Sequence, residues 1–302
     1  MEEEVNVVHS YLKSIGFGGL KTEEELETIL DEVFRKYTDR QAVKEENGNA
    51  FVEYSKAFGP DFGITLCGEM DKNGFHQEYY FPYFRGTGVT SKEDLMVEKH
   101  GSRESYAGVM EDPRVGVSLI FYVQNAVAYK KACVDQMLLN QPVSTTFSGL
   151  SDKGEILLPI CKSEEQLQSD REAVSKRNKL IAAAKKGDEE AIESLTLEDM
   201  DTYSMISQRI QEEDLFTVID TFMMPYGVEC DQYQIMGEIK NVEEAVNEYT
   251  DEKLYFMTLS CNDMIFDICI NQKDLLGEPE EGRRFKGNIW MQGHINFEKG
   301  LD

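Results

Sequence analysis

Two stretches of the sequence, residues 50–160 and 233–297, alternate apolar and polar side chains, and a stretch of helical spacing separates them. Short alternating segments that are rich in aromatic and β-branched residues and end at Gly, Pro, Asn or Asp are typical of β-strands. In the first stretch we expect strands at 50–58, 62–69, 75–83, 94–99, 105–111 and 115–123. A helix at 125–139 and a hairpin formed by 143–149 and 155–160, with its turn at 151–154, are expected to follow.

Two helices are expected before the first of these strands. Residues 7–17 place apolar side chains at helical spacing and end at Gly16, a residue that readily stops a helix. Thr22 and Glu25 have the spacing of a capping box, in which each side chain satisfies a free backbone N–H of the other residue. Helices followed by a run of strands predict an α+β fold with a mainly antiparallel sheet.

The middle of the chain, residues 163–227, predicts an all-helical segment. Ser163 to Gln166 have the pattern of a second capping box, and the charged helix that follows is expected to end at Gly187. Shorter helices are expected at 188–195 and 196–212, and helical spacing continues as far as Pro225.

The period returns to two after Tyr233. Strands are expected at 233–240, 254–260, 264–271 and 284–297, with a tight turn at Asn262-Asp263 and a bend near Gly287 or Gly293. Short strands with glycines at the bends predict a small β-barrel, OB-like or SH3-like. The expected domains are an α+β domain at 1–161, a helical connector at 162–227 and a small barrel at 228–302.

Composition narrows the possible partners and the compartment. The formal net charge of −26 opposes binding to nucleic acid or to an anionic membrane, so we expect neither. No apolar run approaches the roughly 18–20 residues that span a bilayer, and the first residues, MEEEV, are acidic where a signal peptide is basic. The six cysteines are scattered without a CxxC pair and are expected to be buried thiols. A cytoplasmic location follows as the prediction.

The sequence contains no familiar reactive motif. Residues 86–92, GTGVTSK, lack the Gly-Lys-Ser/Thr order of a phosphate-binding loop, and no serine stands in a GxSxG turn. With 57 acidic residues, close carboxylate pairs arise by chance. We therefore predict no catalytic residue, metal or cofactor, although a Cys–His or Ser–His pair could still assemble in space. The histidines are His9 and His76, expected to be packed or on the surface, His100 in a loop, and His294.

The polar face of the closing strand is the candidate binding site. It carries cations, amides, a histidine and the only tryptophan of the chain, and the residues concerned are Arg284, Lys286, Asn288, Trp290, Gln292 and His294. Such a mixture suits recognition of a polar ligand or a partner surface. The alternative is a strand whose outer face meets solvent or a neighbouring domain, with Trp290 packed against the helical segment.

Several segments resemble one known family. They are YLKSIGF at 11–17, SYAGVMEDPRVGVSLIFYVQN at 105–125, GDEEAIESLTLEDMDTYSMISQRIQEEDLFTVIDTFMMPYGVECDQYQIMGEI at 187–239 and CNDMIFDICINQKDLLGEPEEGRRFKGNIWMQG at 261–293. They are similar to a bacterial family from gut anaerobes, domain of unknown function 3881, over nearly the whole chain. The resemblance implies a cytosolic bacterial protein and supplies no activity, cofactor or catalytic residue.

Three interpretations of function remain. The first is a non-enzymatic binding or regulatory module whose partner is another protein, as the modular layout and the missing reactive motifs favour. The second is a hydrolase with a site between the N-terminal domain and the barrel, where pockets often lie. The third is an acidic inhibitor that mimics DNA, which the scattered acids disfavour. An enzyme predicts a pocket with pKa-shifted groups such as His294 or His100, and a binding protein predicts an exposed aromatic patch. The oligomeric state stays open.

Overall fold

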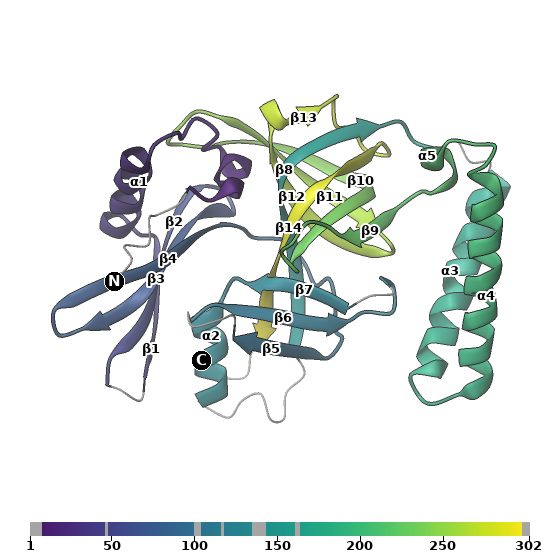
Figure 1. Ribbon diagram of the computed structural model, residues 1–302, viewed down its shortest axis with the longest axis horizontal. Coiled ribbons are helices and arrows are strands. Elements are labelled where there is room, and N and C mark those ends of the chain that lie inside the picture. The colour runs from purple at the N-terminus through teal and green to yellow at the C-terminus, as the bar shows by residue number, and fades with distance from the viewer. Residues whose placement is uncertain are drawn as a thin grey trace. The chain divides into compact units, whose positions relative to one another are not determined.

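The computed structural model describes residues 8–45, 48–99, 104–115, 118–134, 143–160 and 164–297. It is a mixed α+β protein, as expected, and the chain forms two compact units (Figure 1). The larger unit contains Met1–Leu157 and Met223–Asp302, and the smaller one is Leu158–Phe222. The larger unit is therefore built from two pieces of chain that are separated in sequence by the smaller one.

The first sheet of the larger unit has four antiparallel strands in sequence order: β1 (Asp39–Lys44), β2 (Ala50–Gly59), β3 (Phe62–Asp71) and β4 (Gly74–Phe84). The strands β2 to β4 follow the predicted ranges closely, whereas β1 was not predicted. The helix α1 (Glu23–Arg35) packs against β2 and β3 (Figure 1). Its predicted capping box is present, with Glu25 N donating to Thr22 Oγ1 at 3.3 Å.

A short 3-10 helix, η1 (Ser10–Ile15), takes the place of the predicted N-terminal helix. His9 is its N-cap, and Gly16, at φ 89°, ends it as predicted. Tyr11, Leu12 and Ile15 are buried in the hydrophobic core of the larger unit, so the apolar residues at helical spacing in the sequence do pack into a core.

The second sheet has ten strands, drawn from both pieces of the larger unit. Its outer part contains β5 (Leu95–Lys99), β6 (Tyr106–Glu111) and β7 (Ser118–Val123), and helix α2 (Ala126–Val134) follows β7. The short strands are β9 (Phe222–Pro225) and β13 (Leu275–Leu276). The long strands are β8 (Val143–Leu157), β10 (Gln232–Val246), β11 (Lys253–Cys261), β12 (Met264–Asn271) and β14 (Arg284–Phe297).

The five long strands close into a ring through their hydrogen-bonded pairings. The order is β8, β12, β11, β10 and β14, and β14 pairs again with β8. Only the β12–β8 pair is parallel, and the other four are antiparallel. Apolar side chains from all five strands form one buried cluster, including Phe147, Tyr233, Met257, Phe266 and Ile289. The ring therefore has a hydrophobic interior.

The predicted hairpin at 143–160 is wrong, because β8 is one continuous strand. Its residues pair with β14 from Val143 opposite Phe297 to Leu157 opposite Arg284. A Cβ on Gly154 would lie 2.3 Å from the Phe285 ring, so this glycine permits close packing and does not mark a turn. The long partner strand outweighs the local turn preference of residues 151–154.

The smaller unit differs from the predicted helices in two places. Residues 189–209 form one helix, α4 (Glu189–Arg209), where two were expected. Thr196 does not cap a helix, because its hydroxyl donates to Ile192 O at 2.9 Å from within α4. After α5 (Leu215–Val218), residues 222–225 form β9 and pair with β10, so the helical prediction for this segment is wrong.

The helix α3 (Glu164–Ala184) precedes α4, and Gly187 lies in the turn between them at φ 86°. Ion pairs join the two helices, from Lys176 to Glu198 at 2.5 Å and from Arg177 to Asp199 at 2.8 Å. Ser163, the expected capping residue of α3, lies outside the described residues. Among the residues that the structure describes, no helix is both long and apolar enough to cross a bilayer.

The domain boundaries expected from the sequence differ from this arrangement. Residues 228–302 were expected to form a module of their own, but β12 and β14 pair with β8, which belongs to the range 1–161. A closed ring needs all of its strands, and the sequence pattern does not reveal that one of them precedes the helical segment.

Candidate functional site

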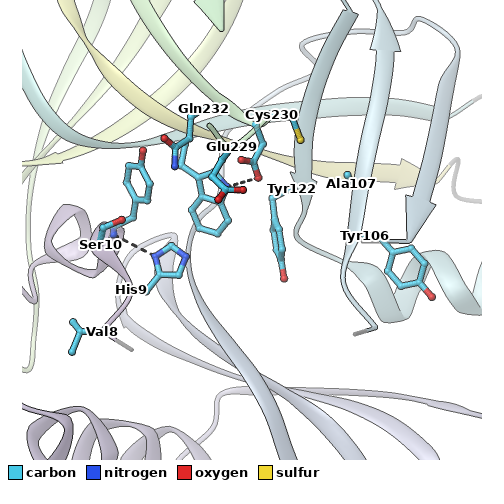
Figure 2. A pocket seen from close by; sticks show the side chains of 12 residues that line it. Val8, His9, Ser10, Tyr106, Ala107, Tyr122, Glu229, Cys230 and Gln232 are labelled. Atoms are coloured by element: carbon cyan, nitrogen blue, oxygen red, sulfur yellow. Dashed lines mark hydrogen bonds between the residues drawn. The ribbon is translucent and has the colours of Figure 1, made fainter. Parts of the chain in front are cut away.

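A pocket of about 490 Å³ opens beside Trp290 in the larger unit (Figure 2). Its wall comes from the start of η1, from β6 and β7, from the segment before β10 and from β14. The lining residues are Val8, His9, Ser10, Tyr11, Tyr106, Ala107, Tyr122, Glu229, Cys230, Asp231, Gln232 and Trp290. In Figure 2, His9 and Tyr122 approach from opposite sides. Both pieces of the larger unit therefore contribute to the pocket.

Trp290 is held in place by contacts on several sides. Its Nε1 donates to Asp231 Oδ2 at 2.7 Å, and the indole is almost fully buried. The ring centroid of His9 lies 4.8 Å from that of Trp290, and the Tyr122 ring lies 5.1 Å away. Tyr11 stacks on the indole at 5.7 Å. An aromatic residue fixed in this way offers a rigid wall to a bound molecule.

His9 is fixed through its backbone and one ring nitrogen. Its backbone N–H donates to the Tyr80 hydroxyl at 2.8 Å, and Nδ1 accepts from Tyr11 N at 3.3 Å. Burial lowers the pKa of His9 to about 4, so the ring is neutral at neutral pH. Because Nδ1 acts as an acceptor, the proton of the neutral ring resides on Nε2.

The charged residues of the pocket are acids. Glu229 is exposed and Asp231 is half-buried, and both line the pocket. Among the described lining residues there is no lysine or arginine. Cys230 is exposed as well, and partial burial together with Asp231 raises the pKa of its thiol, so it stays protonated at neutral pH.

The polar face of β14 is mostly an internal contact surface. Gln292 is fully buried, where its Nε2 donates to Pro82 O at 2.8 Å. Its Oε1 accepts from Phe84 N at 3.2 Å and from Gln124 Nε2 at 2.8 Å. These bonds join β14 to the end of β4, so this part of the face packs against the four-stranded sheet and does not meet solvent.

The other predicted residues of β14 lie along the same strand. Lys286 pairs with Glu155 of β8 at 2.5 Å, and Asn288 Oδ1 accepts from Gln234 at 3.5 Å. Arg284 is buried, and one of its guanidinium nitrogens lies 3.9 Å from the Met236 sulfur. Within the described lining of the pocket, Trp290 is the only member of the predicted set. The assignment of the other five to binding stays a prediction.

His76 and His294 are not among the described lining residues of this pocket. His294 Nε2 is 3.5 Å from Asn125 Nδ2, and burial with the nearby Arg85 lowers its pKa. His76 Nε2 contacts Asp71 Oδ1 at 3.1 Å on the surface of β4. His100 lies outside the described residues. Neither His76 nor His294 therefore supplies a reactive pair with the described lining of the pocket.

The cysteines divide into two groups. Cys67, Cys261 and Cys269 are buried thiols as predicted, whereas Cys133 and Cys230 are exposed, against the prediction. Cys161 lies outside the described residues. Within the described part of the chain, no group of three or more His, Cys, Asp or Glu side chains is arranged to hold a metal ion.

Most of the pocket could not be predicted from the sequence. His9 has the sequence context of an amphipathic helix, and Asp231, Glu229 and Tyr122 belong to no motif. Their proximity depends on the packing of β7 and β14 and of the segment before β10. The feature that could be found was the single tryptophan, which stands out in a chain of 302 residues.

The structure thus defines an α+β protein with a ring of five strands and an acidic, aromatic pocket. The chain belongs to the family described as "Domain of unknown function, E. rectale Gene description (DUF3881)", whose model matches residues 12–293. Comparisons with curated proteins and with solved structures find no match.

Proposed function

We propose that this protein is a non-enzymatic binding or regulatory module that acts in the cytoplasm and whose partner is another protein. The pocket around Trp290 is its ligand-contacting site. The observation that carries the proposal is the way in which the polar groups of this pocket are already engaged. Asp231 accepts from Trp290 Nε1, and His9 Nδ1 accepts from Tyr11 N. Groups held in this way shape a rigid site, as ligand recognition requires.

The described lining of the pocket does not favour nucleophilic catalysis. A nucleophile needs a base within hydrogen-bond reach. In the described structure no hydrogen bond joins His9 to Ser10 or to Cys230. The thiol of Cys230 has a raised pKa and therefore a smaller fraction of thiolate, the reactive form.

A hydrolase remains the second candidate because one observation favours it. The pocket lies where residues of the range 1–161 meet residues of the range 228–302, the place that the sequence suggested for an enzyme site. It also contains pKa-shifted groups, since burial lowers the pKa of His9 and burial, with nearby Asp152 and Asp231, raises that of Tyr11.

Trp290 allows a direct experiment, because it is the only tryptophan and lines the pocket. A library of metabolites and short peptides is screened for changes in tryptophan emission, and each hit is then recovered and analysed by mass spectrometry. A binding module shifts the emission and returns the compound unchanged. Conversion of a hit to a product, lost in the His9→Asn variant, would reverse the order of the two candidates.

For the ring of β8, β12, β11, β10 and β14 we propose a small barrel, OB-like or SH3-like. Five strands, a closed set of pairings and a hydrophobic interior support this assignment. Small barrels of this type bind ligands on their outer faces, and Trp290 lies on the outer face of β14, outside the apolar cluster of the ring.

A further inference from the structure

We infer that the pocket around Trp290 takes an organic cation, meaning an ammonium or guanidinium group carried on an apolar stem. The inference rests on the proposed binding function and specifies the chemistry of the ligand. A free amine and a basic side chain of a partner protein share this chemistry.

The first step of the argument concerns charge. Glu229 and Asp231 bring two carboxyl groups to the lining, and no described lining residue is a lysine or arginine. His9 adds no positive charge at neutral pH, because burial keeps its ring neutral. The chain as a whole carries a formal charge of −26, which attracts cations and repels anions over a long range. An anionic ligand would therefore meet only unfavourable charges here.

The second step concerns the aromatic wall. Trp290, Tyr11, Tyr106 and Tyr122 all line the pocket. The face of an aromatic ring attracts a cation, and indole does so most strongly. Small inorganic cations prefer oxygen ligands and gain little from such a wall. An organic cation gains from both components, because the carboxyl groups and the ring faces both attract its charged group while its stem packs against the rings.

The third step concerns the volume of the pocket and the exposure of its lining residues. A volume of about 490 Å³ lies within the roughly 300–1,000 Å³ that is usual for small-molecule sites. Glu229 is exposed whereas Trp290 is almost fully buried, so at least one carboxyl group of the lining is accessible to a cation that arrives from solvent.

The test uses three compounds of nearly equal shape and different charge. Choline is the cation, and dimethylbutanol, in which a tert-butyl group replaces the trimethylammonium group, is its neutral isostere. Dimethylbutyrate is the anion. Each is titrated into the full chain at low salt while Trp290 emission is recorded. We expect choline to bind at least about threefold more tightly than the neutral isostere, and dimethylbutyrate to bind most weakly.

A pair of variants tests the role of the exposed acid of the lining. Glu229→Gln removes one carboxyl group from an exposed position, so the fold is expected to persist. Choline affinity should fall about two- to fivefold, as for the loss of an exposed charge contact, while dimethylbutanol affinity stays the same. Glu244→Gln removes the same charge from an exposed position of β10 that does not line the pocket, and should leave both affinities unchanged.

The source of the cation is distinguished by a peptide arm. A capped glycine-lysine-glycine peptide is compared with the same peptide carrying norleucine. Tighter binding of the lysine peptide than of choline points to a basic side chain, and the reverse order points to a free amine. Both results support the inference.

Equal affinities for choline and dimethylbutanol would overturn the assignment of a cation while leaving the binding function in place. If neither choline nor the lysine peptide changes the emission of Trp290, the assignment of a cation would also be overturned. Turnover of any compound would instead count against the non-enzymatic function, so the two failures are distinguishable.

Discussion

Glu53 of β2 lies directly opposite Cys67 of β3, and both side chains are buried. Glu53 Oε1 accepts from Val127 N, near the start of α2, at 3.3 Å. The pKa of Glu53 is raised to about 7, mainly by burial. The nearby Asp39 also raises this pKa, whereas the hydrogen bond from Val127 N and the nearby Lys131 lower it. The carboxyl group thus joins α2 to the four-stranded sheet at a pH where most carboxyl groups are ionised.

This relationship predicts a loss of stability as pH rises. The folded pKa of Glu53 lies above its ordinary value of 4.5, so between about pH 4.5 and 7 the unfolded chain releases a proton that the folded chain keeps. The contribution of Glu53 to the free energy of unfolding is fully present below pH 4.5 and falls by about 3 kcal/mol as pH passes 7. Glu53→Gln should abolish this part of the dependence, measured by urea unfolding from pH 5 to pH 8.

The control for Glu53 is Glu244→Gln, which removes an acid from an exposed site. In this variant the free energy of unfolding should depend on pH as it does in the unmodified protein. A Glu53→Gln protein that loses stability as steeply as the unmodified chain would contradict the raised pKa.

His9 predicts an effect of the opposite sign. Its folded pKa of about 4 lies below the ordinary 6.5, so the unfolded state binds a proton first as pH falls. The contribution of His9 is present above pH 6.5 and is lost towards pH 4. His9→Asn retains an acceptor for Tyr11 N and should make the protein less sensitive to acid. NMR of the imidazole should show no titration of His9 above about pH 5, and a midpoint near 6.5 would refute the assignment.

The bond between Trp290 and Asp231 predicts a measurable cost when it is removed. Asp231→Ala leaves the buried Nε1 of Trp290 without its acceptor, a loss of about 1–3 kcal/mol in the free energy of unfolding. Asp231→Asn keeps an acceptor oxygen and should cost less. Urea unfolding followed by circular dichroism measures both variants without relying on the tryptophan. Equal losses would mean that the hydrogen bond contributes little.

The hydrogen bonds of Gln292 indicate that a polar side chain is required at the contact between β14 and β4. Gln292→Met preserves the shape but removes the bonds to Pro82 O and Phe84 N, at a cost of about 2 kcal/mol or more. Gln234→Met is the matched control, because Gln234 is only half-buried and the side-chain hydrogen bond that the structure describes for it, to Asn288, is long. Its thermal and urea stabilities should change by less than about 0.5 kcal/mol. Similar losses in the two variants would argue against the contact.

Gly293 predicts a steric effect that a second substitution relieves. A Cβ at this position would lie 2.4 Å from the Phe121 ring, and one at Gly108 would lie 2.2 Å from it. Gly293→Ala should destabilise the protein by about 1–3 kcal/mol through overpacking. In a Phe121→Leu background the same substitution should cost clearly less, as a double-mutant cycle would measure. Strict additivity would show that Phe121 is not the obstacle.

Local patterns predicted most of the individual elements. The strands β2, β3, β11 and β12 lie close to the ranges that alternation predicted, and β10 begins as predicted but continues beyond residue 240 to Val246. The turn at Asn262-Asp263 was also predicted correctly, and both residues have positive φ, as a tight hairpin turn requires.

The failures have a physical cause in strand pairing, which local sequence patterns do not reveal. Ser151 to Gly154 have turn chemistry, but Ser151 Oγ donates to Asn288 O on β14, some 137 residues away, and the strand stays extended. Residues 222–225 have helical spacing, yet pairing with β10, which follows only a few residues later, makes them a strand. The distant partner of residues 151–154 lies outside any short window of the sequence, whereas at 222–225 the helical spacing concealed a local strand pairing.

The candidate site shows the same limit. Trp290 could be singled out as the only tryptophan, and its neighbours on β14 followed from alternation. The partners that form the pocket, His9 and Asp231, are 281 and 59 residues away from it along the chain. Their proximity is a property of the tertiary fold, and neither residue belongs to a recognisable motif.

The closure of the ring by β14 has a consequence for biosynthesis. β8 leaves the ribosome early, yet one of its two edges within the ring remains unpaired until residues 284–297 have been made. For all of that time an apolar strand edge is available to other nascent chains. Chaperone dependence during translation should therefore be greatest in the interval between the synthesis of β8 and that of β14.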